Sequence, residues 1–350
     1  MVALLGICSA VLLFATTFQL TPVSSSNIQP VAWPTGTVTS GVTSVSWSLN
    51  SSNSIVYTGT GTLANESALQ SVLGAGFSLW SGAKYPPGTG SNVNTLSFSQ
   101  GTDNTNTTFN AADCVNSIGF TDSSLGTAVI ALTVVTSFSA GGATGFTYSC
   151  TAAPTTRTCP HEVCITDADV EFNTHEKFFT PSYSRPPAGY FDLPTVAAHE
   201  IGHMLGLDHS GLANAMMYPY GDTGTGGIKY SLAIDDEIGT VALYSSPAMG
   251  SLFGGISGLV TVGGNPAPGA HVVAIDATTG NVITDTLTDN NGSYMLRMFE
   301  GIYHVLALPL ATDTSGDSGT NGVTSINNYH GWQAGYPTTT VQTQFTGKYY

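Results

Sequence analysis

Residues 199–209, HEIGHMLGLDH, contain side chains that could hold a metal ion and move a proton. His199 and His203 are four residues apart, so on a helix both imidazoles project from one face and can reach one ion about 2.0–2.1 Å away. Gly206 lets the chain leave that helix sharply, so that His209 can return as a third nitrogen ligand. Three neutral imidazoles favour zinc over magnesium or calcium, which require oxygen ligands. We therefore predict one zinc ion with a fourth position open to water.

Glu200 follows the first predicted ligand and is placed to take a proton from that water, as the general base of a hydrolytic reaction on a peptide carbonyl. Five fixed residues in H-E-x-x-H-x-x-G-x-x-H occur by chance in about one in ten thousand chains of this length. The pairs His161-Glu162 and His175-Glu176 have no partner at ligand spacing, so we interpret both as surface residues. The spacing therefore indicates a single catalytic metal site.

The elements that must position these residues are visible as sequence patterns. Asp192 is a good N-cap and Pro194 suits a first turn, so a helix is predicted from there to the glycine at 206. Apolar residues at helical spacing predict an earlier helix from about Ala68 to Trp80, and a last helix spans about Leu232 to Tyr244. Alternating or apolar runs predict strands at about residues 44–50, 96–98, 115–120, 128–135 and 165–174.

His199 to His209, followed by Ser210 and by AMMYPY at 215–220, resemble the metzincin clan and, within it, matrixins of the bacterial type. In matrixins a serine follows the third ligand, and eight residues further on lies the methionine of a tight turn beneath the metal, which corresponds here to Met217. The resemblance further implies a substrate pocket beside the metal, walled by Tyr218, Pro219 and Tyr220.

The resemblance extends over residues 31–246 and implies an α+β, zincin-like domain with a twisted, mixed five-stranded sheet and three helices. It implies that Asp235 and Asp236 are buried structural acids and that 165–174 is the fifth strand. The strand at 128–135 then becomes the fourth, at the sheet edge, where an extended substrate would bind. No H-x-D set for a second, structural zinc occurs between Ala83 and Thr174, so we expect none.

Composition restricts the partners. The 350-residue chain has a formal net charge of −15 and only 7 Lys and Arg, too few to neutralise phosphates, so we do not expect it to bind nucleic acid. Residues 1–25 begin with an uncharged apolar run, which predicts a signal peptide and a secreted, extracellular protein. A retained N-terminal anchor is the alternative, because about 18 apolar residues can just span a bilayer. Contact with a membrane is expected only in that case.

Four cysteines follow the N-terminal run, an even number that predicts two disulfides in an oxidising compartment. They are Cys114, Cys150, Cys159 and Cys164, and three connectivities are open. Cys8 is interpreted as part of the signal.

Residues 252–311 contain short alternating strands separated by turn signals, which predict a small all-β sandwich. This segment resembles carboxypeptidase regulatory-like domains, which are usually noncatalytic. We expect it to have its own core and to supply no metal ligand. Asp289, Asn290 and Asn291 could in principle bind calcium, but no clear motif supports this, and a β-turn held by Asp and Gly explains these residues with fewer assumptions. Residues 312–350 are left unassigned.

The sequence therefore predicts a monomeric, secreted zinc endopeptidase that acts on extracellular proteins and peptides. The alternative is a surface adhesion or binding protein with an incidental or weakly active zinc domain. The intact Glu200 argues against that alternative, because a zinc domain without activity needs no base beside the metal.

Overall fold

The computed structural model describes residues 20–24, 27–34, 43–50, 66–85, 90–92, 95–103, 109, 113–121, 125, 129–139, 143, 145–149, 156–159, 162–179, 186–244, 254–310, 326–336 and 338–349. Residues 1–19 of the predicted signal, with Cys8, lie outside these residues, as do the cysteine at 150, the histidine at 161 and the boundary near 246, whereas residues 20–24 of the predicted signal form a described strand. Within the described residues, every helix is too short or too polar to span a bilayer.

The central element is a five-stranded sheet in the order β6 (Leu96–Gln100), β3 (Thr43–Leu49), β7 (Ser117–Thr121), β11 (Val163–Asn173) and β8 (Ala131–Ser139). The first four strands run parallel, whereas β8 pairs antiparallel with β11 and lies at the sheet edge. The predicted mixed five-stranded sheet and its edge strand are confirmed, although regular pairing begins at Ala131. β11 is buried along its whole length, as expected of a strand flanked on both sides.

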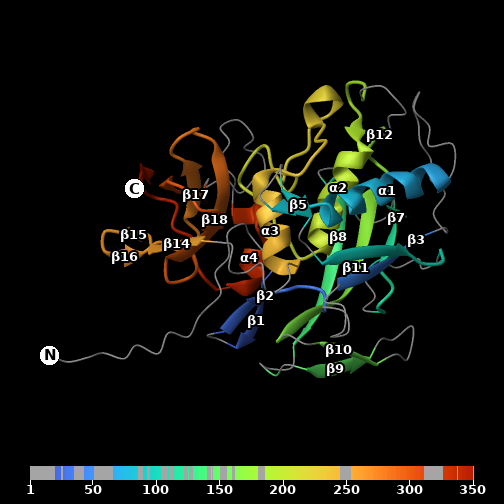
Figure 1. The fold of residues 1–350 in the computed structure, drawn as a ribbon, viewed down its shortest axis with the longest axis horizontal. Coiled ribbons are helices and arrows are strands. Elements are labelled where there is room, and N and C mark those ends of the chain that lie inside the picture. Colours follow the sequence, from blue (N-terminus) through green and yellow to red (C-terminus); the bar gives the residue numbers. More distant parts are fainter. Residues whose placement is uncertain are drawn as a thin grey trace.

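The three predicted helices are α1 (Glu66–Ser81), α2 (Leu193–Met204) and α3 (Ile234–Tyr244) (Figure 1). α1 and α2 pack against each other, and the buried Trp80 of α1 donates a 2.8 Å hydrogen bond to the carbonyl of Ala198. This bond satisfies the indole N–H inside an apolar cluster that joins both helices to the sheet. The packing fixes α2, the helix with two predicted ligands, over the sheet.

Several short elements complete the N-terminal part. They are β1 (Leu20–Ser24), β2 (Asn27–Pro30), β4 (Lys84–Tyr85), β5 (Ser91–Asn92), β9 (Phe146–Ser149), β10 (Thr156–Cys159), β12 (Phe178–Phe179), β13 (Phe191–Asp192) and the 3-10 helix η1 (Gly224–Gly227). A disulfide joins Cys159 to Cys164, with Cα atoms 5.8 Å apart, and Cys114 is also disulfide-bonded. The predicted disulfide chemistry is thus present.

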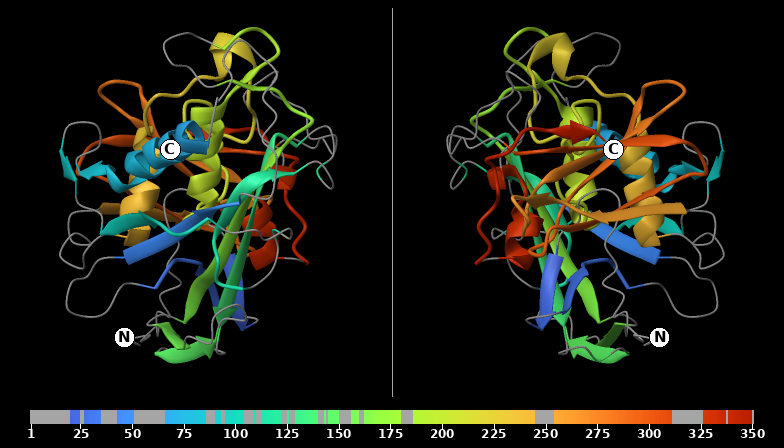
Figure 2. Two further views of the ribbon diagram at one scale, coloured as in Figure 1. Left: turned by 90° about the vertical axis from the view of Figure 1, so that its right-hand side faces the viewer. Right: turned by 90° about the vertical axis from the view of Figure 1, so that its left-hand side faces the viewer.

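The C-terminal part is an all-β unit, as predicted (Figure 2). β14 (Gly254–Leu259) pairs with β19 (Ser293–Met298), and a four-stranded antiparallel sheet has the order β18 (Val282–Leu287), β17 (His271–Asp276), β20 (Tyr303–Leu308), β21 (Lys348–Tyr349). A small hairpin joins β15 (Thr261–Val262) to β16 (Asn265–Pro266).

The segment left unassigned by sequence also has structure. It contains the 3-10 helix η3 (Ile326–Asn328), the short helix α4 (His330–Gly335) and β21. Tyr329 and Trp332 are buried in one apolar cluster with Leu287 and Leu310. This cluster attaches the tail to the β-unit.

The core of the β-unit includes one residue from outside the unit. Ile238 of α3 is fully buried in the cluster formed by Val272, Ala274 and Leu296 of the β-unit. A small sheet pair leaves one apolar face that must be covered, and here α3 covers it. Figure 1 shows α3 lying beside β18. The division at residues 246 and 252 stays a prediction, and α3 contributes buried residues to the cores of both parts.

Candidate metal centre

Helix α2 begins where the sequence predicts. Asp192 is the N-cap, and its Oδ2 accepts hydrogen bonds from the backbone N–H and the hydroxyl of Thr195, at 3.0 and 2.6 Å. After the helix, Gly206 has φ of +91°, and a Cβ there would lie 2.2 Å from the carbonyl oxygen of Val31. Only glycine tolerates both conditions. The chain therefore turns back at this residue and brings His209 over the helix.

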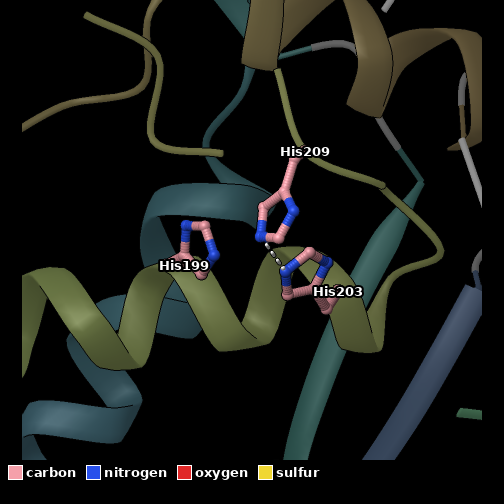
Figure 3. A group of neighbouring side chains, drawn as sticks. All are labelled: His199, His203 and His209. Atoms are coloured by element: carbon pink, nitrogen blue, oxygen red, sulfur yellow. Dashed lines mark hydrogen bonds between the residues drawn. The ribbon is translucent and has the colours of Figure 1, made fainter. Parts of the chain in front are cut away.

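His199, His203 and His209 converge as the spacing predicts (Figure 3). One nitrogen of each ring lies within 4.8 Å of those of the other two, and Nε2 of His203 is 3.2 Å from Nε2 of His209. In the described part of the chain, no other group of three or more His, Cys, Asp or Glu side chains lies at metal-binding distance.

The other ring nitrogens are held by backbone carbonyls. Nδ1 of His199 is 2.8 Å from the carbonyl oxygen of Met216, Nδ1 of His203 is 2.8 Å from that of Leu207, and Nδ1 of His209 contacts that of Asn328. A carbonyl can only accept, so each Nδ1 carries the proton and each Nε2 presents a lone pair. This arrangement is the one that zinc-binding histidines adopt.

Burial keeps the three imidazoles neutral. Desolvation lowers the pKa of His199 to about 3 and that of His203 to about 4, and it lowers the pKa of His209 well below the ordinary value. Neutral imidazoles are the metal-binding form. Three such donors without a carboxylate ligand fit zinc better than magnesium or calcium.

Glu200 is buried next to this group. Its Oε2 accepts a 2.6 Å hydrogen bond from the hydroxyl of Thr133 on the edge strand β8. Burial raises the pKa of Glu200 to about 7, and the hydrogen bond from Thr133 opposes that rise. Sequence reasoning missed Thr133. The predicted position of its strand beside the site was the one signal that could have found it.

The turn containing Met217 contacts the site through the carbonyl of Met216, and the role of Met217 as the methionine beneath the metal stays a prediction. Asp236 accepts hydrogen bonds from the backbone N–H groups of Met216 and Met217, at 2.7 and 3.1 Å. Met217 in turn accepts, through its carbonyl, a 2.9 Å hydrogen bond from the N–H of Ser210. Asp236 thus braces the turn whose Met216 carbonyl orients His199.

Asp235, the neighbouring predicted structural acid, is equally buried but points toward different partners. Its Oδ1 accepts a 2.7 Å hydrogen bond from the hydroxyl of Thr284 in β18. Asp285 next to it accepts from the N–H of Gly211 at 2.9 Å and lies 2.5 Å from Nε2 of His271. The two acids therefore brace different contacts: one the turn under the metal site, the other the junction with the β-unit.

Tyr218, Pro219 and Tyr220, the predicted pocket wall, are partly exposed and follow the turn directly. The rings of the two tyrosines are 5.5 Å apart in an edge-on arrangement, and Nζ of Lys229 lies 5.4 Å from the centre of the Tyr218 ring. The hydroxyl of Tyr220 accepts a 2.7 Å hydrogen bond from the side-chain amide of Asn328. Their role as a pocket wall stays a prediction.

Residues of the C-terminal tail were not anticipated at this site. Asn328 contacts His209, and the backbone N–H of Trp332 donates a 3.0 Å hydrogen bond to Asp208. The ring of His330 lies 6.5 Å from that of His209. No periodic pattern in residues 312–350 distinguishes these positions, so the sequence offered no signal for them.

A protein-family model described as matrixin matches residues 90–245. The chain is 52% identical over 56 residues to karilysin of Tannerella forsythia, a match covering 16% of this chain and 11% of karilysin. It is 48% identical over 56 residues to stromelysin-1 of Mus musculus, covering 16% and 12% of the two chains. It is 40% identical over 86 residues to metalloendoproteinase 1 of Glycine max, covering 24% and 28%.

The chain thus spans about a tenth to about a quarter of the length of these relatives. The match ends at residue 245, and the resemblance of the following segment to carboxypeptidase regulatory-like domains stays a prediction. Residues 90–245 of this chain, which contain the three converging histidines and four of the five strands of the central sheet, thus match the matrixin family.

Proposed function

We propose that this protein is a zinc-dependent endopeptidase that hydrolyses extracellular proteins. The observation that carries the proposal is the convergence of three neutral imidazoles, each with Nδ1 bound to a carbonyl, beside the buried carboxyl of Glu200. The matrixin match over residues 90–245 supports it, as do relatives named as metalloendoproteinases.

His199, His203 and His209 would hold the zinc ion through their Nε2 atoms. Bound zinc supplies Lewis acidity, which lowers the pKa of a water molecule and polarises the scissile carbonyl. Glu200 takes the proton from the attacking water and then gives it to the leaving amine. Thr133 holds one oxygen of Glu200, which fixes the orientation of the carboxyl group during both transfers.

The edge strand β8 is the proposed binding site for the substrate main chain. Among the described residues, β8 pairs with β11 on one side only, so its other side can accept an extended peptide through main-chain hydrogen bonds. Because Thr133 of this strand contacts Glu200, a peptide paired with β8 passes the catalytic base. Side-chain preference then falls to the pocket that we assign to Tyr218, Pro219 and Tyr220.

The proposed extracellular location rests on the apolar N-terminal run and on the disulfide between Cys159 and Cys164. Disulfides persist mainly in oxidising compartments. The proposed partners are protein and peptide substrates, met by a monomeric enzyme.

The test is hydrolysis of casein or gelatin by the purified protein. Activity should disappear with a chelator and return when zinc is added. Glu200→Ala should retain zinc and fold but lose activity by about 10²–10⁴-fold, because it removes the proton carrier and spares every ligand. Zinc-loaded wild-type protein that cleaves nothing yet binds a matrix protein would instead favour the adhesion alternative.

A further inference from the structure

We infer that the C-terminal segment 326–336, which lies outside the matrixin match, completes the metal centre by positioning its third ligand and one wall of its pocket. This inference rests on the proposed function. It concerns residues more than a hundred positions from the histidines in sequence.

The first contact is to the ligand itself. Asn328 ends η3, and its carbonyl accepts the Nδ1 proton of His209. The corresponding carbonyls for His199 and His203 come from Met216 and Leu207, both within the matrixin match. The tail therefore supplies the one ligand-orienting carbonyl, or outer partner, that lies outside the matrixin match. Outer partners of this kind fix the tautomer and the ring orientation of a ligand.

The second contact is to the residue before the ligand. Both Gly331 and Trp332 of α4 donate backbone hydrogen bonds to the carboxylate of Asp208, the latter at 3.0 Å to Oδ2. The other oxygen, Oδ1, accepts from the N–H of His209 at 2.9 Å. One buried carboxylate thus connects the tail to the backbone of the ligand, which holds His209 at both its main chain and its ring.

The third contact reaches the predicted pocket wall. The side-chain amide of Asn328 donates to the hydroxyl of Tyr220 at 2.7 Å. Asn328 therefore has two separable functions: its carbonyl positions the ligand and its side chain orients Tyr220.

The tail is anchored firmly enough to perform these functions. Tyr329 is fully buried, Trp332 is 4% exposed, and both belong to the apolar cluster with Leu287 and Leu310. Nε1 of Trp332 donates a 3.0 Å hydrogen bond to the carbonyl of Thr288. The β-unit is therefore the support on which this part of the metal centre is built.

The test measures zinc affinity in the full-length chain by competition with a chelating dye, on protein shown to be folded by near-ultraviolet circular dichroism. Trp332→Ala removes the side chain that anchors the tail, so the Asn328 carbonyl should no longer be held against His209, and zinc binding should weaken by about 10–100-fold, the usual effect of losing such a partner. The visible spectrum of the cobalt-substituted protein should change, because it reports ligand geometry. Tyr349→Ala, at an exposed aromatic of the same tail, should match the wild type in both measurements.

Asn328→Ala separates the two functions of that residue. It keeps the backbone carbonyl, so zinc affinity and the cobalt spectrum should remain those of the wild type. It removes the hydrogen bond to Tyr220, so KM for peptides should change more than kcat. A loss of zinc affinity as large as that of Trp332→Ala would contradict the assignment of ligand positioning to the Asn328 carbonyl.

If Trp332→Ala does not fold, Trp332→Phe decides the question. It keeps a buried ring but loses the bond to Thr288, so zinc affinity should fall by a smaller factor in the same direction. A folded Trp332 variant with wild-type zinc affinity and an unchanged cobalt spectrum overturns the inference. Failure of the proposed function has a different signature: the wild-type chain itself would bind no zinc or show no zinc-dependent cleavage.

Discussion

The hydroxyl of Thr133 donates a 2.6 Å hydrogen bond to Oε2 of Glu200, which connects the edge strand β8 to helix α2 at the proposed catalytic base. The same hydroxyl lies 3.1 Å from the carbonyl oxygen of Glu200, so its single proton goes to the closer carboxylate.

We expect Thr133→Val to lower kcat about tenfold while zinc affinity stays unchanged, because the valine keeps the shape of the side chain but cannot orient Glu200. Thr133→Ser retains the hydroxyl and should restore most of the activity. Steady-state kinetics on a quenched fluorescent peptide checks both variants. Equal rates for the Val and Ser variants would contradict a positioning role.

We expect one tightly bound zinc ion per chain, because the described residues contain one group of three suitable ligands. Metal analysis of dialysed protein gives the ratio directly. Removal of zinc with a chelator should lower Tm, since a ligand at about 1,000 times its Kd contributes about 4 kcal/mol to stability. Two stoichiometric zinc ions would contradict the predicted absence of a second site.

We expect Asp236→Asn to destabilise the fold by about 1–3 kcal/mol, because an amide presents one acceptor oxygen where the carboxylate serves three backbone N–H groups. Zinc affinity should fall as well, since the Met216 carbonyl that orients His199 lies in the turn that Asp236 braces. Urea unfolding and dye competition measure the two effects. Wild-type values in both would show that the turn holds without Asp236.

We expect Asp169 to make the stability of the fold depend on pH. Its side chain is 2% exposed and accepts a 2.8 Å hydrogen bond from the N–H of Ser117, and burial raises its pKa to about 7. Because the pKa in the folded state exceeds the unfolded value of about 3.9, stability from this group is greatest below pH 4 and falls as pH rises to 7. Asp169→Asn removes the charge and keeps an acceptor.

The free energy of unfolding of Asp169→Asn should therefore exceed that of the wild type by an amount that grows between pH 4 and 7 and is constant above. The excess is at most about 4 kcal/mol, the equivalent of three pKa units. Urea unfolding at pH 5 and pH 8 measures it. Asp169→Ala removes the acceptor for the Ser117 N–H and should therefore lose this gain. Parallel pH profiles for Asp169→Asn and the wild type would contradict a raised pKa at Asp169.

Gly211 lies against the β-unit, so a substitution there tests how tightly the junction between the N-terminal part and the β-unit is packed. A Cβ there would lie 2.5 and 2.6 Å from ring atoms of His271 and 2.8 Å from Oδ2 of Asp285. Gly211→Ala should cost about 1–3 kcal/mol of stability by overpacking. Gly74→Ala in α1 is the control, because nothing lies within 4 Å of its Cβ and alanine favours a helix by about 0.5–1 kcal/mol. Equal stability of the two variants in thermal unfolding would show that the junction is loosely packed.

The sequence by itself determined the parts that depend on local geometry. Two histidines four residues apart on a helix must share a face, and a glycine at 206 permits the turn that returns His209. The cap at Asp192 was likewise found where the residue type indicated, whereas the buried acid at Asp236 was expected from the family resemblance. The order of the sheet followed from the family resemblance, because apolar periodicity alone does not distinguish an edge strand from a central one.

Only the tertiary structure decided which distant groups complete the site. Thr133 meets Glu200, Asn328 meets His209 and Ile238 enters the core of the β-unit, although sequence separations of 67 and 119 residues divide the first two pairs. Such contacts follow from how whole elements pack, and a single Asn in an irregular tail has no periodic signature. The burial that raises the pKa of Asp169 has the same origin, because it depends on the strands around the residue and not on its neighbours in sequence.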